Sequence, residues 1–392
     1  MTLAAFMRIP TIQQSLESLI ASPSVSSVNS QWDQGNRGVI ELLDQWFSDL
    51  GFKSEILPID GYPGKYNLVA SAGSGPEGLV LSGHTDTVPF DESNWHQSPF
   101  KLTERDNRFY GLGTCDMKGF FALVLDAVRD LDLARLRQPL TIIATADEES
   151  TMCGALAVRD LSRHLGRHVV IGEPTNLRPI RMHKGMYSQR LRIVGHSGHS
   201  SNPALGNNAM EGMHKAMTEL LAWRAELQQQ YRNPLFEVDV PTINLGHIHG
   251  GDNPNRICGS CELQFDFRPL PGMDYEDLYS EIEQRIVEKL KDSVLDVRLE
   301  RLFDGIPPME TPATAAIVRA AEELTGHAPE CVAFGTEGPY FNDMGMETVI
   351  LGPGDIAQAH QPDEYVALER LQPMVTILKK LIHRFCLEER NH

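Results

Sequence analysis

The chain has 392 residues, a length that suggests two or three domains at about 150 residues each. Hydrophobic residues make up 41% of it, enough for a sizeable core, which excludes a disordered or fibrous chain. The 53 Asp and Glu outnumber the 35 Lys and Arg, giving a formal net charge of −18. This balance argues against nucleic acid as a partner, since phosphate binding needs clustered Lys and Arg. It is compatible with cationic ligands or metals, and equally with a plain acidic surface.

No uninterrupted apolar run approaches the roughly 20 residues of a membrane-spanning helix, so we expect no membrane partner. The N-terminal stretch lacks a basic start, a long apolar segment and a small-residue cleavage site, which predicts a cytoplasmic protein. Six cysteines are too few for a disulfide scaffold. Cys258 and Cys261 have C-x-x-C spacing within a predicted strand, and we interpret them as ordinary buried thiols.

Two amphipathic helices are predicted first, over 11–22 and 35–50, with Gly51 as a plausible C-terminal cap of the second. Short apolar runs then alternate with helical patterns. The predicted strands are 78–81, 140–144, 169–171 and 349–351, and the predicted helices are 120–133, 153–165, 314–325 and 371–385. Near-continuous apolar strands fit a sheet that helices cover on both faces. The alternation predicts an α/β fold with a mostly parallel central sheet.

The middle of the chain has a different pattern. Strands are predicted at 186–194, 241–245, 256–268 and 295–301, and helices at 208–230 and 275–290. This β-α-β-β-α-β order is typical of a two-layer α+β domain with its helices on one face. We therefore expect a discontinuous domain of residues 1–185 and 306–392, interrupted by an inserted domain of residues 186–305.

Polar residues follow the predicted strands of the first domain, at the edge where open α/β sheets bind ligands. His84 and Asp86 would point the same way in extended chain, so His84 could bind a metal while Asp86 accepts its other ring N–H. Alone, such a pair is more often a structural hydrogen bond. Asp116 lies between glycines before a helical pattern, where a helix N-cap is the alternative to a ligand.

Asp147, Glu148 and Glu149 follow the strand at 140–144. Three consecutive acids are costly there unless metals or cations neutralise them, although a solvated turn is the alternative. Because neighbouring side chains point apart, we expect one of Glu148 and Glu149 to bind metal and the other to act as a base. Glu173 and His360 follow two further strands.

Together these residues indicate a metal centre, since His and carboxylate ligands without thiolate suit zinc, manganese or cobalt. Asp116 could bridge two ions, with His84 and Glu173 on one and Glu149 and His360 on the other. Two divalent ions, three carboxylates and one hydroxide sum to zero charge. Such a pair of ions, roughly 3.5–4 Å apart, could clamp a reacting oxygen. A two-metal phosphatase or nuclease is disfavoured by the acidic charge, and an inactive metal-binding scaffold by the presence of Glu148.

The motifs around these residues resemble the dinuclear-zinc aminoacylase and carboxypeptidase superfamily. They are Gly-His84-Thr-Asp86-Thr-Val-Pro, Gly-Leu-Gly-Thr-Cys-Asp116-Met-Lys-Gly, Asp-Glu148-Glu149 and Gly-Glu173-Pro, and they occur in order through most of the chain. The stretches around Asp91, Ala122, Arg268, Glu337 and Tyr365 are similar to one bacterial branch of it, the deacylases of amino-acid biosynthesis. Cys115 is a departure, because relatives often have Ala or Val there, and a thiol beside zinc could compete for metal.

The resemblance implies a role for each residue. The matches to zinc ligands are His84, Asp116, Glu149, Glu173 and His360. Asp86 matches the residue that orients His84, and Glu148 matches the general base. His199 matches a lid-domain histidine that stabilises the oxyanion and that the partner subunit supplies in the family's dimers.

The resemblance also implies a homodimer through the inserted lid domain and hydrolysis of a small N-acyl amino acid with two divalent ions, zinc first and cobalt or manganese as alternatives. Asn255 and Arg268 match substrate-binding positions, where Arg could grip an α-carboxylate with two hydrogen bonds. Our hypothesis for Glu337 is that it binds a distal ammonium group of the substrate. Desuccinylases, other deacetylases, aminoacylases and dipeptidases of the superfamily share such a site and differ in their acyl and side-chain pockets.

Overall fold

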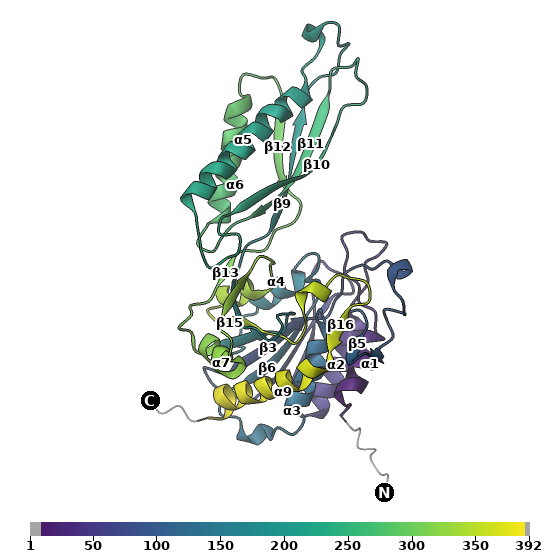
Figure 1. Cartoon of the computed structure of the whole chain (residues 1–392), viewed down its shortest axis with the longest axis vertical. Coiled ribbons are helices and arrows are strands. Elements are labelled where there is room, and N and C mark those ends of the chain that lie inside the picture. The colour runs from purple at the N-terminus through teal and green to yellow at the C-terminus, as the bar shows by residue number, and fades with distance from the viewer. Residues whose placement is uncertain (1–8, 389–392) are drawn as a thin grey trace. The chain divides into compact units, whose positions relative to one another are not determined.

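A computed structural model describes residues 9–388 (Figure 1). The chain forms two compact units. The first unit comprises the residues up to 181, 311–330 and those from 336 onward, and the second unit comprises 182–310 and 331–335. Each has a hydrophobic core of its own. The expected boundaries lay at 186 and 305, and the short segment 331–335 was not expected to join the second unit, because nothing in its composition marks it.

A mixed sheet forms the centre of the first unit, in the order β1-β2-β6-β3-β7-β15-β8-β13, with β14 beside β8. The strands are β1 (Lys53–Pro58), β2 (Tyr66–Ala72), β3 (Leu79–His84), β6 (Leu140–Thr145), β7 (His168–Ile171), β8 (Ile180–His183), β13 (Met309–Glu310), β14 (Glu330–Val332) and β15 (Glu347–Ile350). The four central strands, β6, β3, β7 and β15, are parallel. Every residue of β3, β6 and β7 is buried, as in a sheet covered on both faces.

Helices cover this sheet on both sides. They are α1 (Ile12–Ile20), α2 (Arg37–Asp49), α3 (Lys118–Val128), α4 (Cys153–Arg159), α7 (Ala316–Thr325), α8 (Gly338–Asp343) and α9 (Leu368–Ile382). Figure 1 shows α3 and α9 on one side of β3 and β6, and α4 on the other. Helix α3 packs against β3, α1 and α9, and its side chains are buried nearly all round, as expected for a helix inside a core. The predicted α/β class with a mostly parallel sheet is confirmed.

The second unit is a four-stranded antiparallel sheet with two helices. Its elements are β9 (Tyr187–Val194), α5 (Ala209–Gln230), β10 (Thr242–Gly250), β11 (Ser260–Arg268), α6 (Tyr275–Leu290) and β12 (Asp296–Arg301). The sheet order is β10-β11-β9-β12, which leaves β10 at one edge. Burial alternates along β9 and β11, the pattern of strands with one buried face. This is the α+β arrangement that the sequence predicted.

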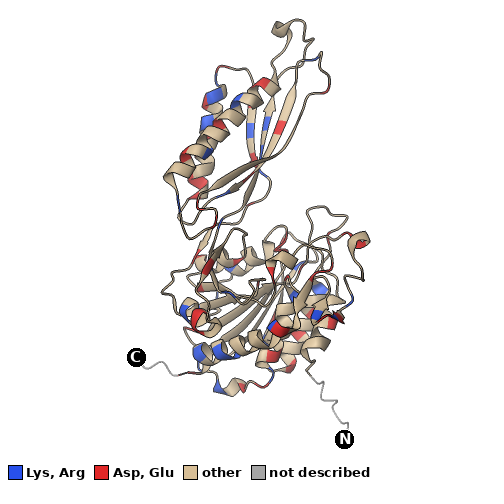
Figure 2. Ribbon diagram, viewed as in Figure 1, with Lys and Arg blue, Asp and Glu red and all other residues tan. Residues whose placement is uncertain are grey.

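Charged residues lie mainly on helices and loops, and the central strands of the first unit are almost free of them (Figure 2). Two details differ from the sequence prediction. Helix α4 ends at Arg159 rather than near 165, and Leu165 is buried in the loop that follows. A small sheet of β4 (Thr103–Arg105), β5 (Arg108–Tyr110) and β16 (Tyr365–Ala367) joins distant segments that show no strand pattern locally. None of the described helices combines the length and apolar character that a membrane crossing requires.

Candidate active site

The four central strands end at one edge of the sheet, and each is followed by a polar residue of interest. Strand β3 ends at His84, whose backbone is in register with Thr145 at the end of β6. Glu173 comes two residues after β7, and His360 lies in the loop beyond β15. Because parallel strands all end at the same edge, residues far apart in the sequence meet there.

Asp116 lies between two histidine rings. Its Oδ1 is 3.2 Å from Nε2 of His84, and its Oδ2 is 3.3 Å from Nε2 of His360. Glu173 Oε1 is 3.8 Å from Nε2 of His84, and Glu149 Oε1 is 2.9 Å from Nε2 of His360. The structure thus brings together two ligand groups, His84–Asp116–Glu173 and Asp116–Glu149–His360, which share the Asp116 carboxylate.

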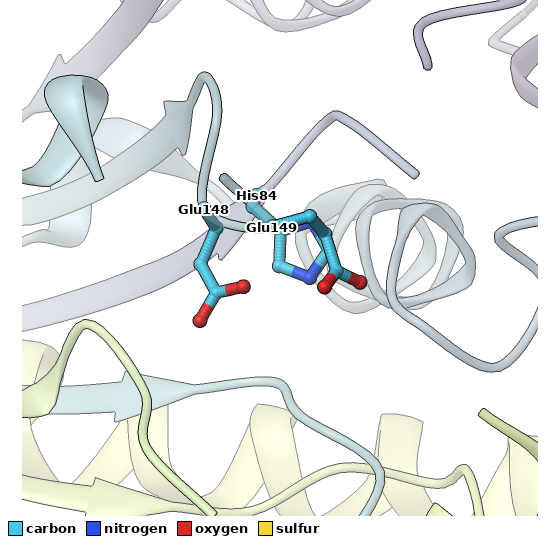
Figure 3. Close-up of side chains that lie close together, drawn as sticks. All are labelled: His84, Glu148 and Glu149. Atoms are coloured by element: carbon cyan, nitrogen blue, oxygen red, sulfur yellow. The ribbon is translucent and has the colours of Figure 1, made fainter. Parts of the chain in front are cut away.

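The side chains of Glu148 and Glu149 point in different directions. Figure 3 shows that the Glu148 carboxylate points away from that of Glu149, as adjacent positions in the chain predict. Each nevertheless offers one oxygen within 4.8 Å of the other's and of a ring nitrogen of His84. The side chain of Glu149 is only 9% exposed and Glu148 is partly buried, so the alternative of a freely solvated acidic turn does not describe them.

Asp86 makes contacts that the sequence did not reveal. Its carboxylate accepts the backbone N–H groups of Glu148 and Glu149, at 3.2 and 3.0 Å. Nδ1 of His84 is 3.0 Å from the backbone oxygen of Asp86 and 3.6 Å from its carboxylate. Asp86 therefore fixes the backbone of the acidic turn as well as lying beside the His84 ring.

Lys65 holds the same turn from another side. Its ammonium group is 2.6 Å from Asp147 Oδ1 and 2.7 Å from Asp33 Oδ1, and it donates to the backbone oxygen of Gln34 at 2.7 Å. Lys65 and Asp147 are almost completely buried, and Asp147 has a left-handed backbone with φ of 57°. Sequence reasoning missed Lys65, because a single lysine in a loop carries no local signal.

The loop that carries Asp116 is tightly packed. A Cβ on Gly113 would lie 2.7 Å from Cε of Lys118, and the backbone of Gly113 has φ of 89°, so glycine is required there. Met117, not Asp116, is the N-cap residue of α3, and it makes no side-chain capping bond. The thiol of Cys115 donates to the backbone oxygen of Asp355, and burial raises its pKa well above the usual value. A raised pKa disfavours the thiolate that would bind a metal.

Burial and mutual repulsion raise the pKa of several carboxyl groups in the site. Burial raises the pKa of Glu148 well above its usual value, and the charge of Glu173 raises it further. Burial and the charge of Asp116 also raise the pKa values of Glu149 and Glu173. A positive charge nearby therefore stabilises the ionised form of these three crowded acids.

The pKa values of the two histidines are raised as well, but by the neighbouring carboxylates and not by burial. Burial lowers the pKa of His84, but the charge of Glu173 and the bonds to Asp116 and Asp86 outweigh it, so the pKa lies well above its usual value. Hydrogen bonds to Asp116 and Glu149 raise the pKa of His360 to about 10. Burial opposes ionisation of Asp116, yet its bonds to the two rings hold its pKa below the usual range. The whole cluster is a site of concentrated negative potential that favours cations.

The donor set fits divalent metal ions. Imidazole nitrogens and carboxylate oxygens are ligands of zinc, cobalt and manganese, and the ligand atoms of each group lie within 4.8 Å of one another. Oε1 of Glu173 is buried and has no hydrogen-bond partner in the described part of the chain, a costly state for a carboxylate oxygen that a bound ion would relieve. Two ions could thus share Asp116.

Glu337 lies at the start of α8 in the first unit. Its side chain is fully buried, and neither carboxylate oxygen has a hydrogen-bond partner among residues 9–388. Burial raises its pKa to about 7, while the nearby Thr145 hydroxyl and the charge of His84 act to lower it. Glu337 is therefore electrostatically connected to the ligand cluster.

The other three residues predicted for substrate or oxyanion binding belong to the second unit. His199 is exposed. Its Nδ1 is hydrogen-bonded to the Ser201 hydroxyl at 2.7 Å, so Nε2 is the ring nitrogen that could bind a ligand. Asn255 is exposed and donates its backbone N–H to Asn253. Arg268, at the end of β11, is held by both carboxylate oxygens of Asp266 through its Nε.

The model of the peptidase family M20/M25/M40 matches residues 80–384, and the chain belongs to this family. The predicted resemblance and the prediction of a metal-dependent hydrolase are confirmed. The acetylornithine deacetylase of Pasteurella multocida is 49% identical over 379 residues, which cover 97% of this chain and 99% of the relative. The enzyme of the same name from Edwardsiella ictaluri is 48% identical over 379 residues, with the same coverage.

Solved structures agree on the fold. The M20 family metallo-carboxypeptidase of Sulfolobus solfataricus aligns with a TM-score of 0.75 at 17% identity, covering 95% of this chain and 98% of that one. A dinuclear metal-binding M20 peptidase of Bacillus subtilis aligns with a TM-score of 0.65 at 13% identity, covering 95% and 96%. At these identities, the likeness concerns the fold alone.

Proposed function

We propose that the chain hydrolyses N2-acetyl-L-ornithine to L-ornithine and acetate, as a step of arginine biosynthesis. The observation that carries the reaction class is the pair of ligand groups sharing Asp116, with the half-buried Glu148 carboxylate beside them. The substrate rests on the near full-length relatives named acetylornithine deacetylase. The substrate assignment also rests on five stretches that resemble bacterial acetylornithine deacetylases. They lie around Asp91, Ala122, Arg268, Glu337 and Tyr365.

Metals are part of the proposal. Two divalent ions, zinc first and cobalt or manganese as alternatives, would be held by His84, Asp116, Glu149, Glu173 and His360, and would supply Lewis-acid activation of a water and of the acyl carbonyl. The Bacillus subtilis relative described as dinuclear supports the number of ions.

Glu148 is the proposed general base. It accepts the proton of the attacking water and then delivers it to the leaving amine nitrogen, two roles that one carboxylate can fill in sequence. The backbone N–H bond from Glu148 to Asp86 fixes the position from which the side chain acts. Lys65 contributes through Asp147, since both restrain the same turn.

We further propose a homodimer through the second unit, in which His199 of the partner subunit donates to the tetrahedral oxyanion. One such donor is typically worth roughly 3–4 kcal/mol of barrier. An apolar groove between α5 and β10 supports the interface, because Met210, Leu221 and Ile248 in it are exposed. Strand β10 is also an unpaired sheet edge. Light scattering of the purified chain tests this, and a monomeric mass would contradict it.

For the substrate's ends, we propose that Arg268 and Asn255 bind the α-carboxylate and that Glu337 meets the distal ammonium. A fully buried carboxylate that forms no ion pair among residues 9–388 favours a cationic partner, which supports Glu337. Because the side chain is fully buried, the site must open for the ammonium to reach it. If Glu337→Gln left the preference for acetylornithine over neutral acyl amino acids unchanged, this assignment would be dropped.

A hydrolysis panel tests the proposal. Purified protein at fixed zinc would be given N-acetylornithine, N-acetylcitrulline, N-acetylmethionine, N-succinyl-diaminopimelate and a dipeptide, each with and without chelator. We expect the highest kcat/KM for N-acetylornithine, abolished by chelator. A chelator-sensitive lead for another member would move the chain to a sibling activity, and no turnover of any member would refute the proposal. A cytoplasmic location is also proposed, and cell fractionation tests it.

A further inference from the structure

Glu364 is a buried acid that the reaction scheme does not use. Its Oε1 accepts three backbone N–H groups from the loop before α3: Gly113 at 3.0 Å, Cys115 at 2.7 Å and Asp116 at 3.0 Å. The side chain is 1% exposed. These N–H groups are its side-chain hydrogen-bond partners within residues 9–388, and the charge of the buried Lys118 acts on it as well. One carboxylate oxygen thus binds three backbone N–H groups of the loop that carries Asp116.

Glu364 also lies close in sequence to a second ligand. It follows His360 by four residues and immediately precedes β16, whose Tyr365 pairs with Tyr110 of β5. The backbone N–H of Gly111 donates to the backbone oxygen of Glu364 at 3.0 Å. The backbone pairing ties the segment after His360 to the segment before Asp116. The backbone oxygen of Glu364 also accepts from the Thr114 hydroxyl at 3.5 Å, and its side chain reaches further, to the N–H of Asp116.

We propose that Glu364 is a positioning residue that fixes Asp116 between His84 and His360 and so determines how tightly the two metal ions are retained. This inference rests on the proposed function, because it presupposes that these residues bind metal. It concerns metal affinity, which can be measured without any substrate.

The physical reason is the strength and geometry of charge-assisted hydrogen bonds. A carboxylate oxygen that accepts three N–H groups holds them more firmly than a neutral acceptor does. One of the three belongs to Asp116 itself, whose two oxygens face different histidine rings. A small shift of that backbone would spoil both ligand groups together. Residues that orient metal ligands in this way typically change metal affinity by about 10–100-fold when altered.

The test compares Glu364→Gln with a neighbouring control. Asp363→Asn removes an acid one position away that contacts His96, with Nδ1 at 2.5 Å and N–H at 3.0 Å, and does not touch the Asp116 loop. Each protein would be stripped with chelator, and zinc would be titrated back by calorimetry. Thermal unfolding of the stripped proteins would be recorded in parallel. Glu364→Gln should bind zinc about 10–100-fold more weakly than the wild type, with Asp363→Asn close to the wild type.

Several results would overturn the inference. Wild-type zinc affinity in Glu364→Gln would do so, including when its stripped form melts at a lower temperature, because that pattern marks a purely structural role. An equal loss of zinc affinity in Asp363→Asn would also overturn the inference, because it would indicate that any change in this segment weakens metal binding. If Glu364→Gln fails to fold, Glu364→Asp decides, since its shorter carboxylate keeps the charge but withdraws from the three N–H groups. A wild type that takes up no zinc would refute the proposed function as well.

Discussion

Lys65→Met should destabilise the first unit by about 3–5 kcal/mol at neutral pH, because it leaves the buried carboxylate of Asp147 without a counter-charge. Asp147 is 5% exposed, and Lys65 Nζ, 2.6 Å from its Oδ1, is the cation that neutralises it. Asp33, the other acidic partner, is 31% exposed and can turn to water, so its share is at most about 1 kcal/mol. The predicted loss therefore comes mainly from Asp147.

Urea unfolding followed by fluorescence would measure the loss for Lys65→Met, Asp147→Asn and the double variant. The double variant removes both charges, so it should recover most of the loss and end within about 2 kcal/mol of the wild type. Lowering the pH should also shrink the Lys65→Met penalty. Burial raises the pKa of Asp147, and a raised carboxyl pKa means that the folded state takes up the proton first and gains stability as pH falls.

Turnover gives a second measurement on the same variants. Because Asp147 precedes Glu148 in the turn, Lys65→Met should lower kcat more than it raises KM. A penalty below about 1 kcal/mol, or a double variant as unstable as the single, would refute the idea that Lys65 compensates Asp147. Unchanged kcat in a folded Lys65→Met protein would show that the turn keeps its shape without the lysine.

Three further predictions follow from the same structure. Glu148→Gln should still bind metal, measured by plasma emission, but lose about 10²–10⁴-fold in kcat, and near-normal turnover would exclude it as the base. Chelator should lower the melting temperature, since zinc at about 100 times its dissociation constant adds about 2.7 kcal/mol, and an unchanged melting curve would contradict a metal centre. Burial lowers the pKa of His183 to about 4. The unfolded chain therefore takes up this proton first as pH falls from 6.5, and folding stability drops by up to about 3 kcal/mol by pH 4. His183→Asn should show a correspondingly smaller drop in urea unfolding over that range, and an identical drop would contradict the buried, neutral imidazole.

The sequence predicted the four parallel strands in the middle of the central sheet. The apolar runs that became β3, β6, β7 and β15 end abruptly in polar residues, and parallel strands bring such ends to one edge. It did not reveal the outer strands β1, β2, β8, β13 and β14 or the three-stranded sheet with β16. Strands β2 and β16 complete these sheets by pairing with β6 and β5, which are far away in the chain and leave no mark in local periodicity.

The same division holds for the site. Local spacing was enough to single out His84 with Asp86, the turn at Glu148 and Glu149, and the glycine-flanked Asp116, because each motif lies within a few residues. Only the tertiary structure decided that Asp116 lies between two histidine rings, one of them from a loop 244 residues further along the chain.

The residues that hold the site in place were also decided by the tertiary structure. Lys65 reaches Asp147 across 82 residues, and Glu364 binds the N–H of Asp116 across 248 residues. Neither has a neighbour in the sequence that hints at its partner. A buried charge is stable only where the fold places a counter-charge or hydrogen-bond donors next to it. That placement depends on how distant segments pack together. The sequence by itself thus determined which residues could do the chemistry, and long-range packing decided what holds them in place.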